Sequence, residues 1–388
     1  MFEGIITTIE FQLSLLLFVA LAGYIIAAKI NQSAIVWEIL IGIAIGPSLL
    51  GLITYTETVR SFAQIGAVVL LFVVGLEFNI KDIFNVKYGI IALIGVIIPW
   101  IGGFFLANVF GFDFISSVFV GTALTATSVA ITANVLREMG KLQTETARAI
   151  IGAAVIDDVL GLLILSFSMQ IASKSLSIIP LVLILAEAAA FMIVGAFIGY
   201  KYLSKLIEKL DGTKLAGKFP ETVFIFAMMI AFFYALISES IGLSAIVGAF
   251  LAGVALTSTN IKHGKNFKEG AEYLQIIFAS IFFVSLGVLA NFHLLTIQIV
   301  WFLIALTVVA FLTKIIGCYL GARIVNMGHK ISLAVGMGMA PRGEVAMIVA
   351  LIGLNLGVIK QDLYVSIILM SLLTTMFVPI ILRYYMKE

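Results

Sequence analysis

Apolar runs of about 20 residues follow one another along almost the whole chain, and no other feature limits its fold as strongly. A helix needs about 20 mostly apolar residues to cross the hydrocarbon core of a bilayer. With 62% hydrophobic and 11% charged residues, the composition excludes a soluble globular domain of this size. The sequence therefore predicts an all-α polytopic membrane protein with about 13 transmembrane helices. The predicted spans are residues 7–29, 34–53, 60–78, 89–110, 115–136, 146–170, 178–200, 220–238, 243–258, 272–291, 295–321, 331–358 and 363–384.

Basic residues are sorted between the predicted loops. If the N-terminus lies outside, the cytoplasmic loops and tail hold 18 basic residues, and only Arg60, Lys174 and Lys360 lie on the other side. The positive-inside rule then predicts a multi-pass protein of the cell membrane with its N-terminus outside and its C-terminus in the cytoplasm. Lys314 and Arg342 are left within predicted spans.

Three further features set expectations about organisation. The charged segment 201–218 is typical of a solvated cytoplasmic connector. The single cysteine, Cys318, excludes an internal disulfide and is expected to be a small packing residue. We expect neither a cleaved leader nor an attached soluble nucleotide-binding domain.

A weak internal repeat recurs at a spacing of about 210 residues. Residues 41–46 resemble residues 247–252, and residues 71–76 resemble residues 282–287. Six spans, one linking span and six more would place the second copy upside down relative to the first, which is the inverted-repeat plan of secondary transporters. The predicted units are a first repeat over 1–170, a linking helix over 178–200 and a second repeat over 220–388.

Asp157 and Asp158 are adjacent in a segment that is otherwise apolar enough to span the bilayer. Each ionised Asp at a helix centre costs about 3 kcal/mol, so a cation, a proton, water or a basic partner must offset the pair. Neighbours on a helix point about 100° apart, so one carboxylate can meet a fixed cation while the other opens onto a cavity. There it could bind a proton and a small cation in turn. The alternative is a protonated pair that is hydrogen-bonded in a helix interface.

Lys314 lies deep in the predicted span 295–321 and is the obvious fixed cation for these carboxylates. A buried lysine readily loses its proton, so Lys314 could be a passive counter-ion or a proton carrier. The alternative is that its ammonium snorkels to the membrane surface.

The span 331–358 contains Gly336-Met-Gly-Met-Ala-Pro-Arg-Gly-Glu344, which predicts a broken helix at mid-depth. Arg342 and Glu344 are expected to hold this break together or to pair with Glu77, rather than to contact substrate. The hydroxyl-rich segment 122–128 occupies the corresponding place in the fifth span. Its hydroxyls could bind Na⁺ or bond back to the helix, and no break can be derived there.

Several motifs in the same order resemble the monovalent cation:proton antiporter-2 family, which includes sodium/proton antiporters and potassium-efflux transporters. Together they extend over nearly the whole chain. They are Gly46-Pro-Ser-Leu-Leu-Gly51, Gly75-Leu-Glu77, Thr125-Ala-Thr-Ser128, Ile151-Gly-Ala-Ala-Val-Ile-Asp-Asp-Val-Leu-Gly161, Lys314-Ile-Ile-Gly317 and Pro341-Arg-Gly-Glu344.

The resemblance implies two broken helices that cross within a core domain, here about 60–170 and 272–358, beside a domain that forms a homodimer interface. It implies an elevator-like movement of the core. Carried over residue by residue, Asp158 resembles the carboxylate that binds Na⁺ and protons. Asp157 resembles the partner of Lys314, and Thr127 and Ser128 lie in the break at the cation site.

The resulting prediction is a secondary antiporter that exchanges cytoplasmic Na⁺, or Li⁺, for external H⁺ by competition at Asp158, with electrogenic stoichiometry. We expect no enzyme activity, no cofactor and no nucleic-acid partner; the partners are the two ions, the lipid bilayer and a second copy of the chain. The alternatives are a K⁺/H⁺ antiporter of the same family and a cation channel. A membrane prenyltransferase and a membrane aspartyl protease are disfavoured, because the chain lacks a second Asp-rich cluster and a Gly-x-Gly-Asp motif.

Overall fold

The computed structural model describes residues 8–30, 33–78, 85–174, 177–257, 259, 265–290, 292–294 and 297–386. Every regular element in these ranges is helical, as the sequence predicts. The elements are α2 (Ile9–Ile30), α3 (Ala34–Ile45), α4 (Glu57–Leu76), α6 (Val86–Val109), α7 (Phe114–Ala123), α8 (Val129–Glu138), α9 (Glu145–Ala172), α10 (Ile178–Ile198), η1 (Gly199–Leu203), α11 (Ser204–Asp211), α12 (Lys214–Lys218), α13 (Glu221–Ser240), α14 (Ala245–Leu256), α15 (Lys265–Val288), η2 (Phe292–Leu294), α16 (Ile297–Ile324), α17 (His329–Gly338), α18 (Glu344–Asn355) and α19 (Gln361–Met386).

The described helices have the lengths that a polytopic membrane protein requires. Nine are long and apolar enough to cross a bilayer, and four apolar helices of 10–17 residues accompany them. The short helices include α3 and α14, which lie in predicted spans. Because these are shorter than a full crossing, the total of about 13 spans stays a prediction.

Two predicted spans are interrupted near their centres. The fifth divides into α7 and α8, and the twelfth divides into α17 and α18. The second break falls at Pro341 and its neighbouring glycines, as predicted. The first falls where hydroxyls bond back to the helix: Thr122 Oγ1 donates to Val118 O and Thr125 Oγ1 donates to Thr122 O, both at 2.8 Å.

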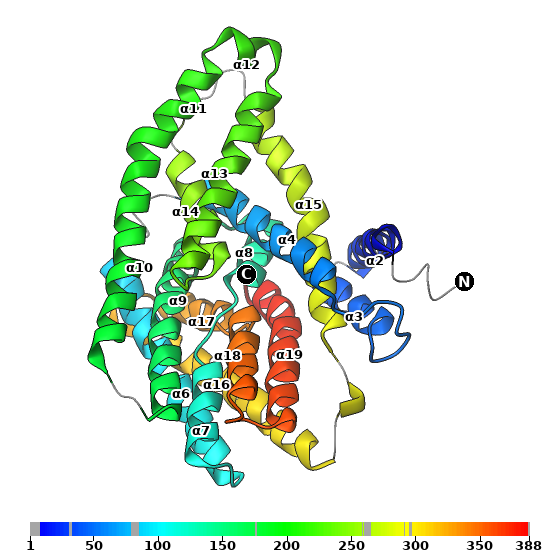
Figure 1. Cartoon of the computed structure of the whole chain (residues 1–388), viewed down its shortest axis with the longest axis vertical. Coiled ribbons are helices and arrows are strands. Elements are labelled where there is room, and N and C mark those ends of the chain that lie inside the picture. Colours follow the sequence, from blue (N-terminus) through cyan, green and yellow to red (C-terminus); the bar gives the residue numbers. More distant parts are fainter. Residues whose placement is uncertain are drawn as a thin grey trace.

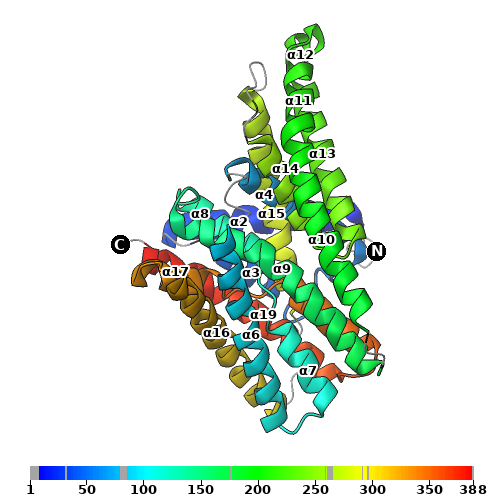
Figure 2. The same cartoon turned by 90° about the vertical axis from the view of Figure 1, so that its left-hand side faces the viewer.

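The charged connector forms the tip of a long helical hairpin. Helix α10 continues through η1 into α11, so that these elements form one rod along the side of the molecule (Figure 1). Helix α12 lies at the tip of this rod, beyond the rest of the bundle, and α13 returns beside it (Figure 2). Tyr234 of α13 donates a hydrogen bond to Gly195 O of α10 at 2.8 Å, which ties the two arms together.

The remaining helices pack in two groups. In one group α4 packs most extensively on α14 and α15, and α15 packs on α3. In the other, α6 packs on α16 and α7, while α19 lies against α16, α17 and α18, as Figure 1 shows. Helices α2 and α13 join the first group through α3 and α14, and α9 joins the second through α6. The candidate site lies in the second group.

Close glycine contacts recur in the first group at the spacing of the predicted repeat. Gly42 of α3 faces Gly287 of α15, and Gly75 of α4 faces Gly253 of α14. A Cβ atom on any of them would lie 2.2 or 2.3 Å from a carbonyl oxygen of the facing helix. Gly253 follows Gly42 by 211 residues, and Gly287 follows Gly75 by 212. Such small residues let membrane helices approach closely, and here each of the two contacts joins a helix of the first half of the chain to a helix of the second half.

We expect Gly253→Val to destabilise the protein by about 1 to 3 kcal/mol, because the added atoms would overlap the backbone of α4 near Phe72 O. The measurement is the midpoint of thermal unfolding in detergent. Gly161→Ala is the matched control, since a Cβ atom at this mid-helix glycine meets nothing within 4 Å. If both variants unfold at the same temperature, the close approach of α4 and α14 is wrong.

Candidate functional site

The two adjacent aspartates lie near the middle of α9 in different surroundings. Thr144 caps the start of this helix of 28 residues and accepts a hydrogen bond from Ala147 N at 3.2 Å. Asp157 is 1% exposed, whereas Asp158 is partly exposed. This difference matches the 100° offset between neighbours on a helix. The pair therefore offers one sealed carboxylate and one that keeps some access.

Lys314 of α16 is the cation that meets the sealed carboxylate. Its Nζ atom donates to Asp157 Oδ1 at 2.7 Å and to the carbonyl oxygen of Thr125 at 2.7 Å. The side chain is 0% exposed, so the snorkelling alternative is wrong. Because Thr125 lies between α7 and α8, this one ammonium connects α16, α9 and the first break.

The two breaks contact each other directly. Ser128 N donates to Pro341 O at 2.9 Å, and Thr127 Oγ1 donates to Met339 O at 3.3 Å. These bonds satisfy backbone groups that an uninterrupted helix would pair internally. Gly343 is needed at the crossing, because a Cβ atom there would lie 2.6 Å from the Cβ and Oγ atoms of Ser128. Thr127 and Ser128 thus lie in the break, as the family resemblance implies.

Arg342 holds the two breaks together. Its guanidinium donates to Ala126 O at 2.5 Å and to Ala310 O of α16 at 2.9 Å, and it is fully buried. The expected role in bracing the break agrees with these contacts. The alternative pairing of Arg342 with Glu77 is wrong, because both terminal nitrogens of the guanidinium donate to backbone carbonyls inside the core.

Glu77 lies elsewhere and makes a different ion pair. It caps the end of α4, and its carboxylate lies 4.0 Å from Arg137 of α8. Its carbonyl oxygen also accepts a hydrogen bond from Gln143. Glu77 therefore joins α4 to α8 and to the segment before α9. Glu344 begins α18, but its side chain lies outside the described residues.

Oxygen atoms without protein partners mark where an ion or proton could be held. Among the described residues, Ser128 Oγ and Asp157 Oδ2 are buried and accept no hydrogen bond. An unpaired buried oxygen is costly, and an alkali cation is coordinated by such carboxylate and hydroxyl oxygens. The hydroxyl and carboxylate oxygens at the crossing are therefore of the kind that a hard cation binds.

Three supporting threonines are not singled out by the sequence. Thr374 of α19 accepts a hydrogen bond from Arg342 N at 3.2 Å, and Thr375 donates to Arg342 O at 2.7 Å. Thr132 of α8 donates to Gly338 O at 2.5 Å, where α17 ends. The only signal for them is a hydroxyl within an apolar run, and this is too common in membrane helices to identify a site.

We expect Asp157 and Lys314 to behave as a coupled pair. Asp157→Asn and Lys314→Met should each lower stability by about 3 to 5 kcal/mol, because each leaves one buried charge without its partner. The double variant should lose less than the sum of the two. The measurement is a double-mutant cycle on thermal unfolding in detergent.

Lys360→Met is the matched control for this cycle, because Lys360 is exposed. Its loss should change stability little, and it should add independently to Asp157→Asn. Additive effects for Asp157→Asn and Lys314→Met would show that the buried contact contributes no coupling.

Comparison with known proteins identifies the family. Residues 15–388 match the profile described as sodium/hydrogen exchanger, transmembrane. The Na(+)/H(+)-K(+) antiporter GerN of Bacillus cereus is 34% identical over 376 residues, covering 96% of this chain and 95% of GerN. The Na(+)/H(+) antiporter of Enterococcus hirae is 34% identical over 382 residues, covering 97% of each chain.

Solved structures support the fold. The sodium proton antiporter MjNhaP1 from Methanocaldococcus jannaschii at pH 8 matches 96% of this chain and 95% of its own, with a TM-score of 0.67 and 19% identity. A second structure of MjNhaP1, an electron microscopy map, gives a TM-score of 0.72. The fold is the sodium/proton antiporter fold, and the chain belongs to the sodium/hydrogen exchanger family of transmembrane proteins.

Proposed function

We propose that this chain is a secondary antiporter of the monovalent cation:proton antiporter-2 subfamily that exchanges cytoplasmic Na⁺, or Li⁺, for external H⁺. Its family consists of membrane transporters rather than enzymes, and its relatives include Na⁺/H⁺ antiporters. The observation that carries the proposal is the different exposure of two adjacent carboxylates at the crossing of two broken helices. Asp157 is sealed against Lys314, and Asp158 is partly exposed.

In this proposal Asp158 binds Na⁺ and protons in turn. The hydroxyls of Thr127 and Ser128 and the carbonyls of the breaks supply further oxygen ligands, as a hard cation prefers. When the site faces the cytoplasm, Asp158 releases protons and binds Na⁺; when it faces outward, it exchanges Na⁺ for protons. Moving a bare carboxylate past lipid is expensive, so only the occupied or protonated core moves.

Charge balance at the crossing favours a second titrating group. Asp157, Asp158, Lys314 and Arg342 carry two negative and two positive charges when all are ionised. With Lys314 protonated, one excess positive charge remains whether Asp158 holds Na⁺ or a proton, and a low-dielectric site disfavours such a charge. Release of a proton from Lys314 would remove it. If Lys314 releases this proton when Na⁺ binds and regains it when Asp158 is protonated, one Na⁺ exchanges for two protons, which is electrogenic.

The packing suggests which parts move. We assign α6 to α9 and α16 to α19 to a mobile core, and α2 to α4 with α13 to α15 to a scaffold, with α10 as the link. The core predicted from the sequence comprises residues 60–170 and 272–358. The assignment proposed here instead places α4 and α15 in the scaffold and α19 in the core.

We propose that the scaffold forms a homodimer, that the N-terminus lies outside and that the C-terminus lies in the cytoplasm. Light scattering that gives the mass of one 41.9 kDa chain would exclude the dimer. A C-terminal tag cleaved by external protease would exclude this orientation.

Transport of K⁺ is the second candidate. The name of GerN includes both Na⁺ and K⁺, and GerN is 34% identical to this chain. Selectivity depends on the size of the site and the number of its oxygen ligands. Collapse of a pH gradient in proteoliposomes by each cation separately distinguishes the two candidates.

We expect Asp158→Asn to abolish exchange and leave the protein folded, because the amide can neither bind a proton nor balance a cation. The measurement is Na⁺-induced collapse of a pH gradient in proteoliposomes, scanned over pH and Na⁺ concentration. In the unsubstituted protein, extra Na⁺ should move the acid limb of activity to lower pH, since both ions compete for one carboxylate.

Asp362→Asn is the matched control, because Asp362 lies at the start of α19, away from the crossing, and should retain exchange. Monodisperse elution of both variants in detergent confirms folding. Normal Na⁺/H⁺ exchange by Asp158→Asn would overturn the assignment of the site.

We expect membrane potential to shift the balance point of exchange. If one Na⁺ exchanges for two protons, 100 mV contributes about 2.3 kcal/mol to each cycle and changes the Na⁺ gradient at which flux reverses by about 50-fold. The measurement is the reversal gradient in proteoliposomes under imposed potassium diffusion potentials set with valinomycin. A reversal gradient that ignores voltage would mean that Asp158 is the only titrating group.

A further inference from the structure

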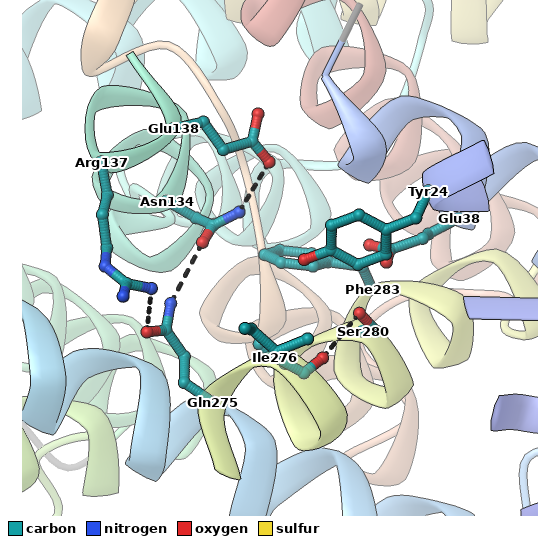
Figure 3. A pocket seen from close by; sticks show the side chains of 10 residues that line it. Tyr24, Glu38, Asn134, Arg137, Glu138, Gln275, Ile276, Ser280 and Phe283 are labelled. Atoms are coloured by element: carbon teal, nitrogen blue, oxygen red, sulfur yellow. Dashed lines mark hydrogen bonds between the residues drawn. The ribbon is translucent and has the colours of Figure 1, made fainter. Parts of the chain in front are cut away.

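A second polar cavity lies between the two groups of helices, away from the crossing of the breaks. It has a volume of about 190 Å³ and is lined by side chains of α2, α3, α8 and α15, as Figure 3 shows. Glu38, Glu138 and Arg137 line it together with Tyr24, Asn134 and Ser280. At roughly 30 Å³ for each water molecule, it can hold a small ion with several waters.

Glu38 is the feature of this cavity that requires explanation. It lies within the apolar helix α3, is 2% exposed, and lines the cavity. Among the described residues its Oε1 atom is buried without a hydrogen-bond partner. Gly23 of α2 makes room for it, because a Cβ atom on that glycine would lie 2.8 Å from Glu38 Cγ. A buried carboxylate oxygen without a partner is unfavourable unless something neutralises it.

The other charged groups at the cavity are already paired. Arg383 donates to Glu138 at 2.8 Å. Arg137 lies 3.5 Å from Glu272 and 4.0 Å from Glu77. In the described ranges no basic side chain lies within ion-pair distance of Glu38. Glu38 is therefore the charged group lining this cavity that has no ion-pair partner among the described residues, and a bound cation would compensate it.

The neutral groups around Glu38 present oxygen atoms. Ser280 Oγ donates its hydrogen to Ile276 O at 2.9 Å, so its lone pairs remain available for a cation. The phenol of Tyr24 lies beside Glu38 and Phe283 in Figure 3. Asn134 lies opposite on α8, where it donates to Glu138 at 3.2 Å and accepts from Gln275 at 3.3 Å. Carboxylate, hydroxyl and water oxygens are the ligands that hard cations prefer.

We propose that this cavity is a second cation site, which binds one alkali cation at Glu38, with Tyr24 and Ser280 as further ligands. It is separate from the site at Asp158. This second site is additional to the proposed function. It depends on that function only because Asp158 is taken as the first cation site.

Binding here would act on the arrangement of the two helix groups. Glu38, Tyr24 and Ser280 belong to the scaffold group, and Asn134 and Glu138 belong to α8, which continues from the first break. Ser33 at the start of α3 already donates across this boundary to Glu138 at 2.8 Å. A cation bound at Glu38 would also attract the carboxylate of Glu138 on α8, which lines the same cavity, and would so stabilise this arrangement over any in which α8 moves away.

The test counts bound cations. Binding of radioactive ²²Na⁺ to purified full-length protein in detergent is measured by equilibrium dialysis at pH 8.5 and constant ionic strength. We expect two saturable sites in the unsubstituted protein, one in Glu38→Gln, one in Asp158→Asn, and none in the double variant. Glu187→Gln is the matched control, because Glu187 is an exposed carboxylate on α10 and should retain both sites.

Two results would overturn the second site. In the first, the Glu38→Gln variant binds as many Na⁺ ions as the unsubstituted protein. In the second, the Asp158→Asn variant is folded and binds no Na⁺. The second result would mean that Glu38 is neutralised by a proton alone. If Glu38→Gln does not fold, Ser280→Ala with Tyr24→Phe should weaken one class of sites by at least about tenfold and leave the other unchanged. Retention of exchange by Asp158→Asn would instead contradict the proposed function, so the two failures are distinguishable.

Discussion

The ammonium of Lys314 is the contact on which the geometry of the site depends. It joins Asp157 to the carbonyl oxygen of Thr125, and Arg342 bonds the next carbonyl, that of Ala126. Two adjacent carbonyls released by the first break are thus held by two buried cations. In a bilayer such carbonyls have no water from which to accept hydrogen bonds, so these two cations stabilise the break by supplying the donors. The charge of the cations in turn requires the aspartates.

Much of the fold can be predicted from the sequence because membrane helices are determined by local composition. Apolar length identifies the long helices, and Pro341 with its glycines predicts the break between α17 and α18. The break between α7 and α8 could not be derived. It depends on Ser128 N reaching Pro341 O and on the Lys314 contact, which are tertiary interactions between distant segments. The allocation of helices to packing groups depends on such contacts too.

The site could be predicted in its charges but not in its partners. A charge within an apolar run needs a compensating group, and this argument identifies Asp157, Asp158, Lys314 and Arg342 from the sequence. It cannot say that Arg342 bonds carbonyls rather than Glu77, because both arrangements satisfy the charge. Glu38 is likewise a charged residue within an apolar run. Only the structure, which shows its cavity and its unpaired oxygen, indicates that it could bind an ion.

Helix α8 connects the two polar regions of the molecule. Ser128 at its start meets Pro341 in the crossing, and Asn134 and Glu138 near its end line the second cavity. A helix of 10 residues transmits displacement as a rigid body of about 15 Å. Any movement of α8 that changes the position of Ser128 must therefore also move Glu138 relative to Glu38 and Ser33 near the start of α3. If the two ions prefer different positions of α8, or the same one, binding of either ion shifts α8 and changes the affinity for the other. This coupling is reciprocal: the ion in the second cavity changes the affinity at the crossing by the same factor as the ion at the crossing changes the affinity in the cavity.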